Sequence, residues 1–198
     1  MARPRMFDEE RALDAAMRTF WEKGYEATST QDLCEATGLG RSSIYNTFKS
    51  KRDLFERALA YYIDTMTTAQ LAVLEDSRHS AADRIRALLV MVVDGETENR
   101  VGGRSLGCLT VNTTVELAAR DSRAAGILER DTARRLTALR AVIEEGRRDG
   151  SITSPRDAHA LARFINAAIG GMRVSSQGGA DRTTLESIAE VTLDALIC

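Results

Sequence analysis

Residues 29–52, STQDLCEATGLGRSSIYNTFKSKR, decide the fold of this chain. Ser29 or Thr30 can cap a short helix at the start of this stretch, because a hydroxyl oxygen accepts a hydrogen bond from an N–H group of the first helical turn. Gly38 stands where that helix must stop, since the turn needs a left-handed residue, which glycine adopts without strain. We therefore predict two short helices joined by a tight turn, with a third, basic helix starting directly behind them.

The second short helix is anchored by Ile44 and Phe48, which lie four residues apart and share one face. Its other side chains are short, polar and rich in hydrogen-bond donors, as a helix in the DNA major groove requires. They are Arg41, Ser42, Ser43, Tyr45, Asn46 and Thr47. The pattern predicts a helix-turn-helix whose second helix reads DNA. The alternative is an ordinary polar face on a small helical bundle.

A dozen positions carry a resemblance to a known family, and they agree in order and spacing. They are Phe20, Gly24, Thr28, Leu33, Gly38, Leu39, Tyr45, Phe48, Lys49, Lys51, Leu54 and Phe55. With them, residues 8–57 resemble the tetracycline-repressor (TetR) family of bacterial regulators. Two positions depart from the family pattern. Gly40 replaces the serine or threonine that often caps the recognition helix, and Thr47 replaces an aromatic residue or histidine.

The resemblance implies which side chains touch DNA. Base-edge contacts are expected from Arg41, Ser42, Ser43 and Asn46. Phosphate contacts, which position the helix, are expected from Thr30, Tyr45, Thr47, Lys49 and Lys51. The geometry of the side chains favours guanine for Arg41 and adenine for Asn46. The resemblance also implies a homodimer formed through the last two helices, a palindromic operator, and a small-molecule effector that releases a repressor from its DNA.

Composition limits the class of protein. The chain has 198 residues, of which 43% are hydrophobic, as is usual for a globular protein. Its net charge is only −2, so a protein that reads DNA must concentrate its cationic side chains locally, as in Arg3, Arg5 and Arg41. No apolar run approaches a membrane span. Three distant cysteines fit a reducing cytoplasm, where we expect this protein. The isolated His79 and His159 predict no metal site, and no motif indicates an enzyme or a cofactor.

The hydrophobic periodicity is helical throughout, and prolines occur only at positions 4 and 155, which favours long helices. We predict an all-α chain of about nine helices, with a DNA-binding domain at 1–52 and an effector-binding and dimerisation domain at 53–198. Residues 1–7 are expected to form a flexible arm and 96–105 a loop. Besides the helix-turn-helix, helices are expected at 8–23, 51–75, 80–95, 106–120, 121–148, 154–173 and from 181 or 183 onward.

A polar stripe in the second domain suggests an effector site. Cys108, Asn112 and Glu116 are spaced i, i+4 and i+8, so they share one side of a helix, where polar groups could orient a ligand in an apolar cavity. Phe164 is the one aromatic residue after position 62, so we expect an aliphatic, small or reactive effector instead of a flat cation. Two alternatives remain open. Cys108 can be inert packing, or the thiol of a repressor that senses oxidants or electrophiles.

Two stripes that mix small and aliphatic residues occur in the last two helices, and such stripes let helices approach closely. They are Ala158, Leu161, Ala162, Ile165, Ala168, Ile169 and Met172, and Leu185, Ile188, Ala189, Val191, Thr192, Leu193 and Leu196. We expect them to form the dimer interface that the resemblance implies. The alternative is a purely internal core.

Overall fold

The computed structural model describes residues 5–101 and 104–197. These residues form nine helices and one two-residue antiparallel ladder, which confirms the predicted all-α fold. The chain divides into two compact units. The head unit comprises Met1–Thr65 and Cys108–Leu128, and the body unit comprises Met66–Gly107 and Glu129–Cys198. Among the described residues, no helix is both long and apolar enough to cross a membrane.

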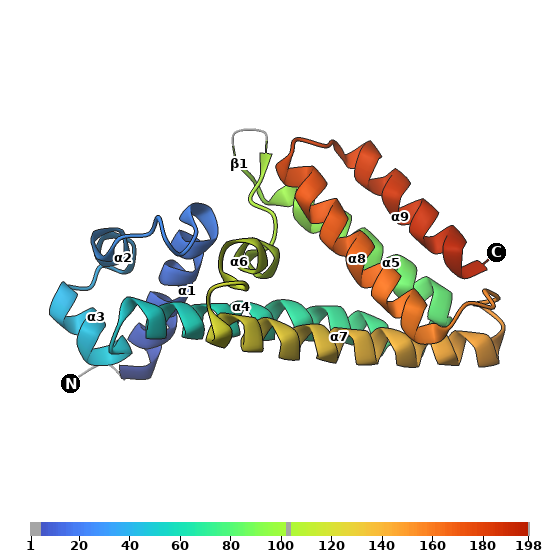
Figure 1. The fold of residues 1–198 in the computed structure, drawn as a ribbon, viewed down its shortest axis with the longest axis horizontal. Coiled ribbons are helices and arrows are strands. Elements are labelled where there is room, and N and C mark those ends of the chain that lie inside the picture. The colour runs from blue at the N-terminus through green and yellow to red at the C-terminus, as the bar shows by residue number, and fades with distance from the viewer. Residues whose placement is uncertain (1–4, 102–103, 198) are drawn as a thin grey trace. The chain divides into compact units, whose positions relative to one another are not determined.

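The head unit contains α1 (Arg5–Lys23), α2 (Thr30–Thr37), α3 (Arg41–Phe48), the first part of α4 (Lys51–Leu74), α6 (Leu109–Leu117) and the start of α7 (Ser122–Asp149). Figure 1 shows α1, α2 and α3 gathered around the N-terminal end of α4. Their contact surfaces are apolar, and Phe20, Leu33 and Phe48 are completely buried. The Phe20 and Phe55 rings meet edge to face with centroids 5.1 Å apart. The periodic apolar residues of the sequence thus form one small core.

The body unit is built around α5 (Ala81–Glu98), α8 (Ala158–Gln177) and α9 (Arg182–Ile197), which pack side by side (Figure 1). Two residues of β1 (Arg100–Val101) pair with two of β2 (Arg104–Ser105). The later parts of α4 and α7 complete the unit, and its core is almost entirely aliphatic. A core of this kind offers packing and few hydrogen-bonding groups.

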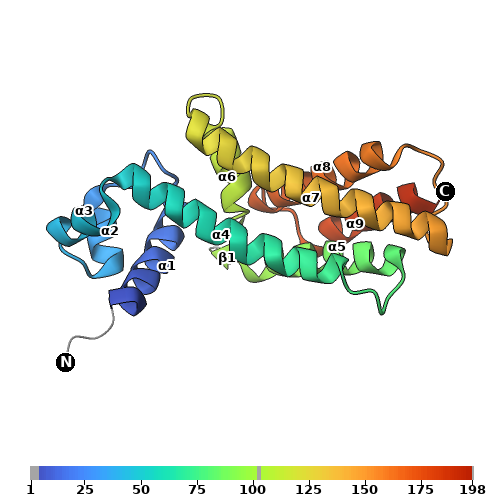
Figure 2. The same ribbon diagram turned by 90° about the horizontal axis from the view of Figure 1, so that it is seen from below.

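A polar cluster joins α4 to α7 inside the body unit, where Figure 2 shows these helices next to each other. The Thr67 hydroxyl donates to the Asp131 carboxylate at 2.6 Å, and the Arg135 guanidinium lies 3.0 Å from the other carboxylate oxygen. Asp131 is only 5% exposed. Burying a charge is costly unless it is paired, and these two partners provide the pairing.

A second buried acid lies beside the short ladder. The Ser105 hydroxyl donates to Glu96 at 2.5 Å, and the Arg173 guanidinium is 4.0 Å from the carboxylate. Burial raises the pKa of Glu96, while Ser105 and Arg173 act in the opposite direction. Ser105 and Arg173 hold Glu96 in a helix that continues to Glu98, so the expected loop from residue 96 is wrong at its start. It is also wrong at residues 100–101 and 104–105, which pair as β1 and β2.

Other predicted helix boundaries are also wrong. α1 begins at Arg5 and not at Asp8, since residues 5–7 have no helix-breaking side chain. The expected arm is therefore partly helical, and Arg3 lies outside the described residues. α6 begins at Leu109, because the Leu106 backbone is already bonded to Asn99 and to Gln177.

The start of α8 differs most from the prediction. Ser154 and Pro155 were expected to open this helix, but α8 starts at Ala158. The N–H groups of Thr153 and Ser154 donate to the Leu196 carbonyl at 3.1 and 3.0 Å. Asp157 is the actual cap, and its carboxylate accepts from the Ala160 N–H at 2.9 Å. A contact with the C-terminal helix therefore overrides the local start signal.

The two stripes expected at a dimer interface are mostly internal. Ten of their fourteen residues lie in the buried core of the body unit. The internal-core alternative is thus correct for them, because α8 and α9 use these faces against α5 and against each other. The large apolar side chains that remain exposed on the two helices are Phe164, Val174, Val191 and Ile197.

Candidate DNA-binding site

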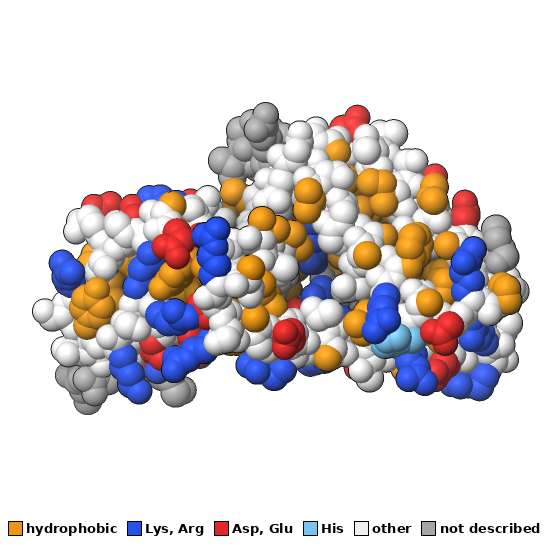
Figure 3. Space-filling model, in the orientation of Figure 1, with side chains coloured by type: hydrophobic (Ala, Val, Ile, Leu, Met, Phe, Trp, Pro, Cys, Tyr) orange, Lys and Arg blue, Asp and Glu red, His pale blue; other side chains and the backbone are white. Residues whose placement is uncertain are grey.

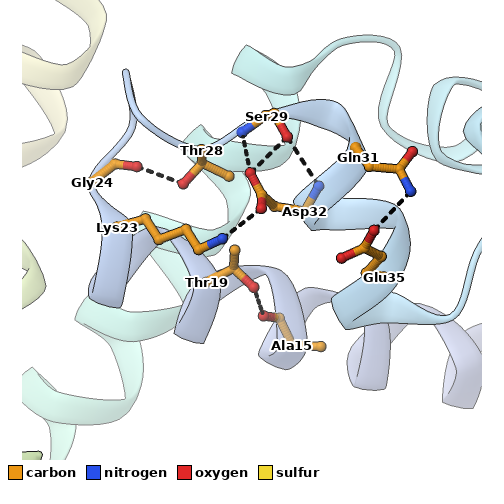
Figure 4. A network of polar contacts seen from close by, with 9 residues as sticks. All are labelled: Ala15, Thr19, Lys23, Gly24, Thr28, Ser29, Gln31, Asp32 and Glu35. Carbon is orange, nitrogen blue, oxygen red and sulfur yellow. Dashed lines mark hydrogen bonds and ion pairs between the residues drawn. The ribbon is translucent and has the colours of Figure 1, made fainter.

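The first helix of the motif, α2, is fixed at both ends. Its cap is Ser29, whose hydroxyl accepts from the Asp32 N–H at 3.1 Å, while the Ser29 N–H donates to the Asp32 carboxylate at 2.7 Å (Figure 4). The Lys23 ammonium donates to the same carboxylate at 2.5 Å. Lys23 and Ser29 together hold the pKa of Asp32 well below its usual range. Gly38 ends α2 with a φ of 68°, as predicted from the turn.

The second helix, α3, presents most of its predicted DNA contacts to solvent. Ile44 is 1% exposed and Phe48 is completely buried, so both anchor the helix as expected. Four polar side chains on the remaining surface are exposed, and they are Arg41, Ser42, Ser43 and Asn46. Gly40 supplies no side-chain hydrogen bond at the N-terminus of α3, so its first N–H groups have no protein side chain as a cap.

Tyr45 links the two helices of the motif. Its hydroxyl lies 3.1 Å from the Thr30 hydroxyl at the start of α2, and the Arg41 guanidinium lies 5.8 Å from the centre of its ring. The Thr30 hydrogen bond, and after it Arg41, lower the pKa of Tyr45. The Tyr45 ring and the two hydroxyls are thereby held in place before any DNA is bound. Thr47, one turn from Ser43, is half-buried.

Two predicted phosphate contacts occur where α3 ends and α4 begins. Lys49 is exposed and ends α3 with a φ of 54°, a left-handed conformation that few residues other than glycine adopt. The Lys51 ammonium lies 4.5 Å from the centre of the Tyr25 ring and 3.5 Å from the Glu26 carbonyl oxygen. Lys51 is therefore positioned by the loop between α1 and α2.

A groove of about 550 Å³ adjoins the recognition helix between α1, α3 and α4. Ser43, Asn46 and Thr47 line it together with Glu9 and Arg57. The Arg57 guanidinium donates to the Glu9 carboxylate at 2.9 Å and lies 5.5 Å from the centre of the Phe48 ring. Sequence reasoning missed both residues. Arg57 is four residues after Asp53, a spacing that could have indicated an ion pair, whereas nothing in the sequence connects Glu9 to α3.

The predicted effector residues fall in both units. Cys108 precedes α6 as its N-cap residue and is 2% exposed, and its sulfur is 3.4 Å from the Tyr62 hydroxyl and 2.9 Å from the Thr110 hydroxyl. Asn112 is half-buried on α6. Phe164 is 44% exposed on α8, in the body unit.

Glu116, the last residue of the predicted stripe, has a specific position in the head unit. One carboxylate oxygen accepts from the Tyr25 N–H at 3.0 Å, and the other accepts from the Glu26 N–H at 2.8 Å. The carboxylate is therefore bound to the loop ahead of α2. A ligand group that binds Glu116 has to displace these two donors.

A small cavity lies inside the body unit, between α4, α5, α7 and α8. Its polar lining consists of Gln70, Arg135 and Asn166, and the rest is leucine and isoleucine. The volume is about 10 Å³, which is about the space of one water molecule. None of the three polar residues was selected from the sequence, because they lie on three helices without a shared motif.

Two protein-family models match this chain and together span most of its length. The model for bacterial regulatory proteins of the tetR family matches residues 12–58, and the model for the tetracyclin repressor-like C-terminal domain matches residues 81–191. The chain belongs to the TetR family. The resemblance of residues 8–57 is thereby confirmed, and with it the prediction of a DNA-binding transcriptional regulator with a helix-turn-helix.

Several TetR-family relatives align over nearly the full chain. The HTH-type transcriptional repressor ComR of Escherichia coli K12 is 35% identical, over 96% of this chain and 90% of its own length. YezE of Bacillus subtilis 168, an uncharacterized HTH-type transcriptional regulator, is 31% identical over 99% and 100%. A cysteine mutant of the TetR-family regulator CifR, solved in complex with 26-bp operator DNA, is 28% identical with a TM-score of 0.83, over 98% and 100%.

Proposed function

We propose that this TetR-family protein is a transcriptional repressor that binds a palindromic operator as a homodimer and leaves it when a small-molecule effector binds. The observation that carries the proposal is the surface of α3. Arg41, Ser42, Ser43 and Asn46 are exposed on a helix that Ile44 and Phe48 anchor from the opposite side. Such a helix suits direct reading of base edges in the major groove.

The phosphate contacts follow from the same arrangement. We propose that phosphates on both sides of the groove are bound from α2, from α3, from the residue after α3 and from the start of α4, by Thr30, Tyr45, Thr47, Lys49 and Lys51. The net charge of the chain is −2, so a general attraction to DNA is weak, and the specificity of binding depends on this local set.

The dimer part of the proposal is supported by exposed apolar side chains on α8 and α9, a region where Figure 3 shows apolar surface. Phe164, Val174, Val191 and Ile197 are between 44% and 62% exposed. An apolar surface of this kind is typical of an interface. A symmetric dimer would place its two recognition helices on the two halves of a palindromic site.

For the effector we propose an aliphatic, small or reactive molecule that contacts Cys108, Asn112 and Glu116 in the head unit. The scarcity of aromatic side chains after residue 62 argues against a flat cationic drug. The effector acts only through its differential affinity for the DNA-binding and released states. A repressor that responds to oxidation of Cys108 is the alternative.

The test starts with selection of binding sites from random duplexes by the purified wild-type protein at physiological salt. We expect a two-fold symmetric consensus. Fluorescence anisotropy on that consensus then compares Arg41→Ala and Tyr45→Ala with Arg78→Ala, whose side chain is 84% exposed in the body unit. Loss of a bidentate base contact should weaken binding about 10- to 100-fold for Arg41→Ala. The Arg78 variant should bind like the wild type.

The variants also separate the two roles. Arg41→Ala should relax the sequence preference at one position of each half-site, and Tyr45→Ala should weaken binding to all sequences alike. Circular dichroism and sedimentation check that each variant stays folded in the same oligomeric state. Unchanged binding by both variants would contradict the proposed role of α3, and a failure of the wild type to enrich any sequence would contradict the function itself.

A further inference from the structure

Glu116 is the only charged residue of α6, and it does not face solvent freely. Its two oxygens accept one backbone N–H each, from Tyr25 and Glu26. Gly24 brings the backbone close: it has a φ of 79°, and a Cβ at this position would lie 3.1 Å from both Glu116 oxygens. The carboxylate thus packs against the backbone of residues 24–26, and it can come this close because Gly24 has no side chain.

Residues 24–29, which we call the α1–α2 loop, lead directly into the helix-turn-helix. The Tyr25 ring packs against the Phe55 ring with centroids 4.8 Å apart, and the Lys51 ammonium lies 4.5 Å from the centre of the Tyr25 ring. Four residues later, Ser29 caps α2. The backbone that Glu116 holds is therefore connected both to the start of α4 and to the start of α2.

A second contact ties the same part of the chain to the head. Asp121, four residues after α6 ends, forms an ion pair with Arg52 at the start of α4. The Asp121 carboxylate also accepts from the N–H groups of Arg123 and Ala124, so it caps α7 as well. The chain enters α6 from the body unit at Gly107 and returns to it along α7. α6 is therefore one of the segments that connect the two units along the chain, and α4 is another, because the boundary between the units also falls within it.

We propose that Glu116 is a positioning residue for DNA binding, which fixes the α1–α2 loop so that α2 and α3 keep the arrangement that fits the major groove. The inference rests on the proposed function and names the residue through which α6 controls it. Hydrogen bonds to an ionised carboxylate are about twice as strong as neutral ones, and two of them on adjacent N–H groups fix the direction of the loop. A shift of α6 lengthens both and loosens the start of α2.

The experiment compares Glu116→Gln and Glu116→Ala with Val115→Ala, whose side chain is 83% exposed on the same helix. Glutamine keeps the size of the side chain but replaces one acceptor oxygen by a donor, which cannot pair with a backbone N–H. Affinity for the selected consensus is measured by fluorescence anisotropy. Amide hydrogen exchange at Tyr25 and Glu26 is measured on the same proteins, together with thermal unfolding.

We expect about tenfold weaker operator binding for both Glu116 variants, as for the loss of a charge-assisted hydrogen bond. The amides of Tyr25 and Glu26 should exchange faster, the melting temperature should stay near that of the wild type, and Val115→Ala should match the wild type in every measurement. If Glu116→Ala fails to fold, Glu116→Gln decides the matter alone.

Two results would overturn the inference and leave the proposed function intact: wild-type operator affinity in Glu116→Gln, or weaker binding that is matched by a general loss of thermal stability. The second result would mean that Glu116 only stabilises the fold. If the wild-type protein enriches no DNA sequence, the proposed function fails first, and the role of Glu116 in DNA binding fails with it.

Discussion

Replacing Gly38 by alanine should destabilise the head unit by a predictable amount. Gly38 ends α2 at φ 68° and ψ 13°, and no heavy atom lies within 4 Å of the place that a Cβ would take. The cost is therefore conformational strain without a clash, about 1–2 kcal/mol for a left-handed alanine. The smaller freedom of alanine in the unfolded chain offsets about 0.4–1 kcal/mol of it. The free energy of unfolding should fall by about 1 kcal/mol.

Trp21 provides the assay, since it is the only tryptophan of the chain. It lies on α1 in the head unit, with its ring centroid 5.1 Å from that of Tyr62. Its fluorescence in a urea titration, at a fixed protein concentration, therefore reports on the head unit. With a typical dependence of 1–3 kcal/mol per molar urea, the midpoint for Gly38→Ala should drop by about 0.3–1 M.

The matched control is Gly40→Ala, two residues further along. Its surroundings are equally open, but its φ is −68°, which alanine adopts without strain. Alanine stabilises the fold by lowering the entropy of the unfolded chain, but it is a poorer N-cap than glycine, and the two effects nearly cancel. We expect the free energy of unfolding to change by less than about 0.5 kcal/mol. If Gly38→Ala and Gly40→Ala unfold at the same urea concentration, the left-handed conformation is not what Gly38 contributes.

Two further predictions concern the head unit. Asp32 has a lowered pKa in the folded state, so its contribution to stability is present above its unfolded pKa and is lost as the pH falls through the folded one. Asp32→Asn should therefore be less stable than the wild type at pH 7, and the difference in urea midpoint should shrink below about pH 4; a constant difference would exclude this linkage. Cys108 is 2% exposed, so hydrogen peroxide should leave operator binding unchanged in the wild type and in Cys108→Ser. If peroxide releases the wild type from its operator but not Cys108→Ser, the thiol-sensor alternative is correct.

Local signals account for the parts of the fold that the sequence predicted well. Ser29 caps α2, Ser80 caps α5, and Gly38 ends α2, because each of these interactions involves only neighbouring residues. The predicted boundaries failed where a distant group intervenes. Ser154 is the clearest case, since its N–H bonds to Leu196, more than forty residues away. The residues within one helical turn of Ser154 give no indication of such a partner.

The candidate site shows the same division. The exposure of Arg41 and Asn46 follows from the position of Ile44 and Phe48, which periodicity gives directly. Glu116 was selected for its spacing relative to Cys108, but its carboxylate partners are backbone N–H groups 90 and 91 residues earlier. Every residue except proline has a backbone N–H, so a pattern of side chains does not indicate which N–H groups will bind a carboxylate. This contact could therefore be found only from the structure.

The head unit is discontinuous in the sequence, and this limits how the protein can be recombined. A chimeric regulator made by joining residues 1–65 of this chain to the remainder of a relative would separate Arg52 from Asp121 and the α1–α2 loop from Glu116. The transplanted recognition helix, α3, would keep its own sequence, but its unit would lose the contacts made by Glu116 on α6 and by Asp121 just before α7. A working exchange of DNA specificity between such proteins requires that residues 108–128 travel with the N-terminal segment, or that only the surface of α3 is replaced.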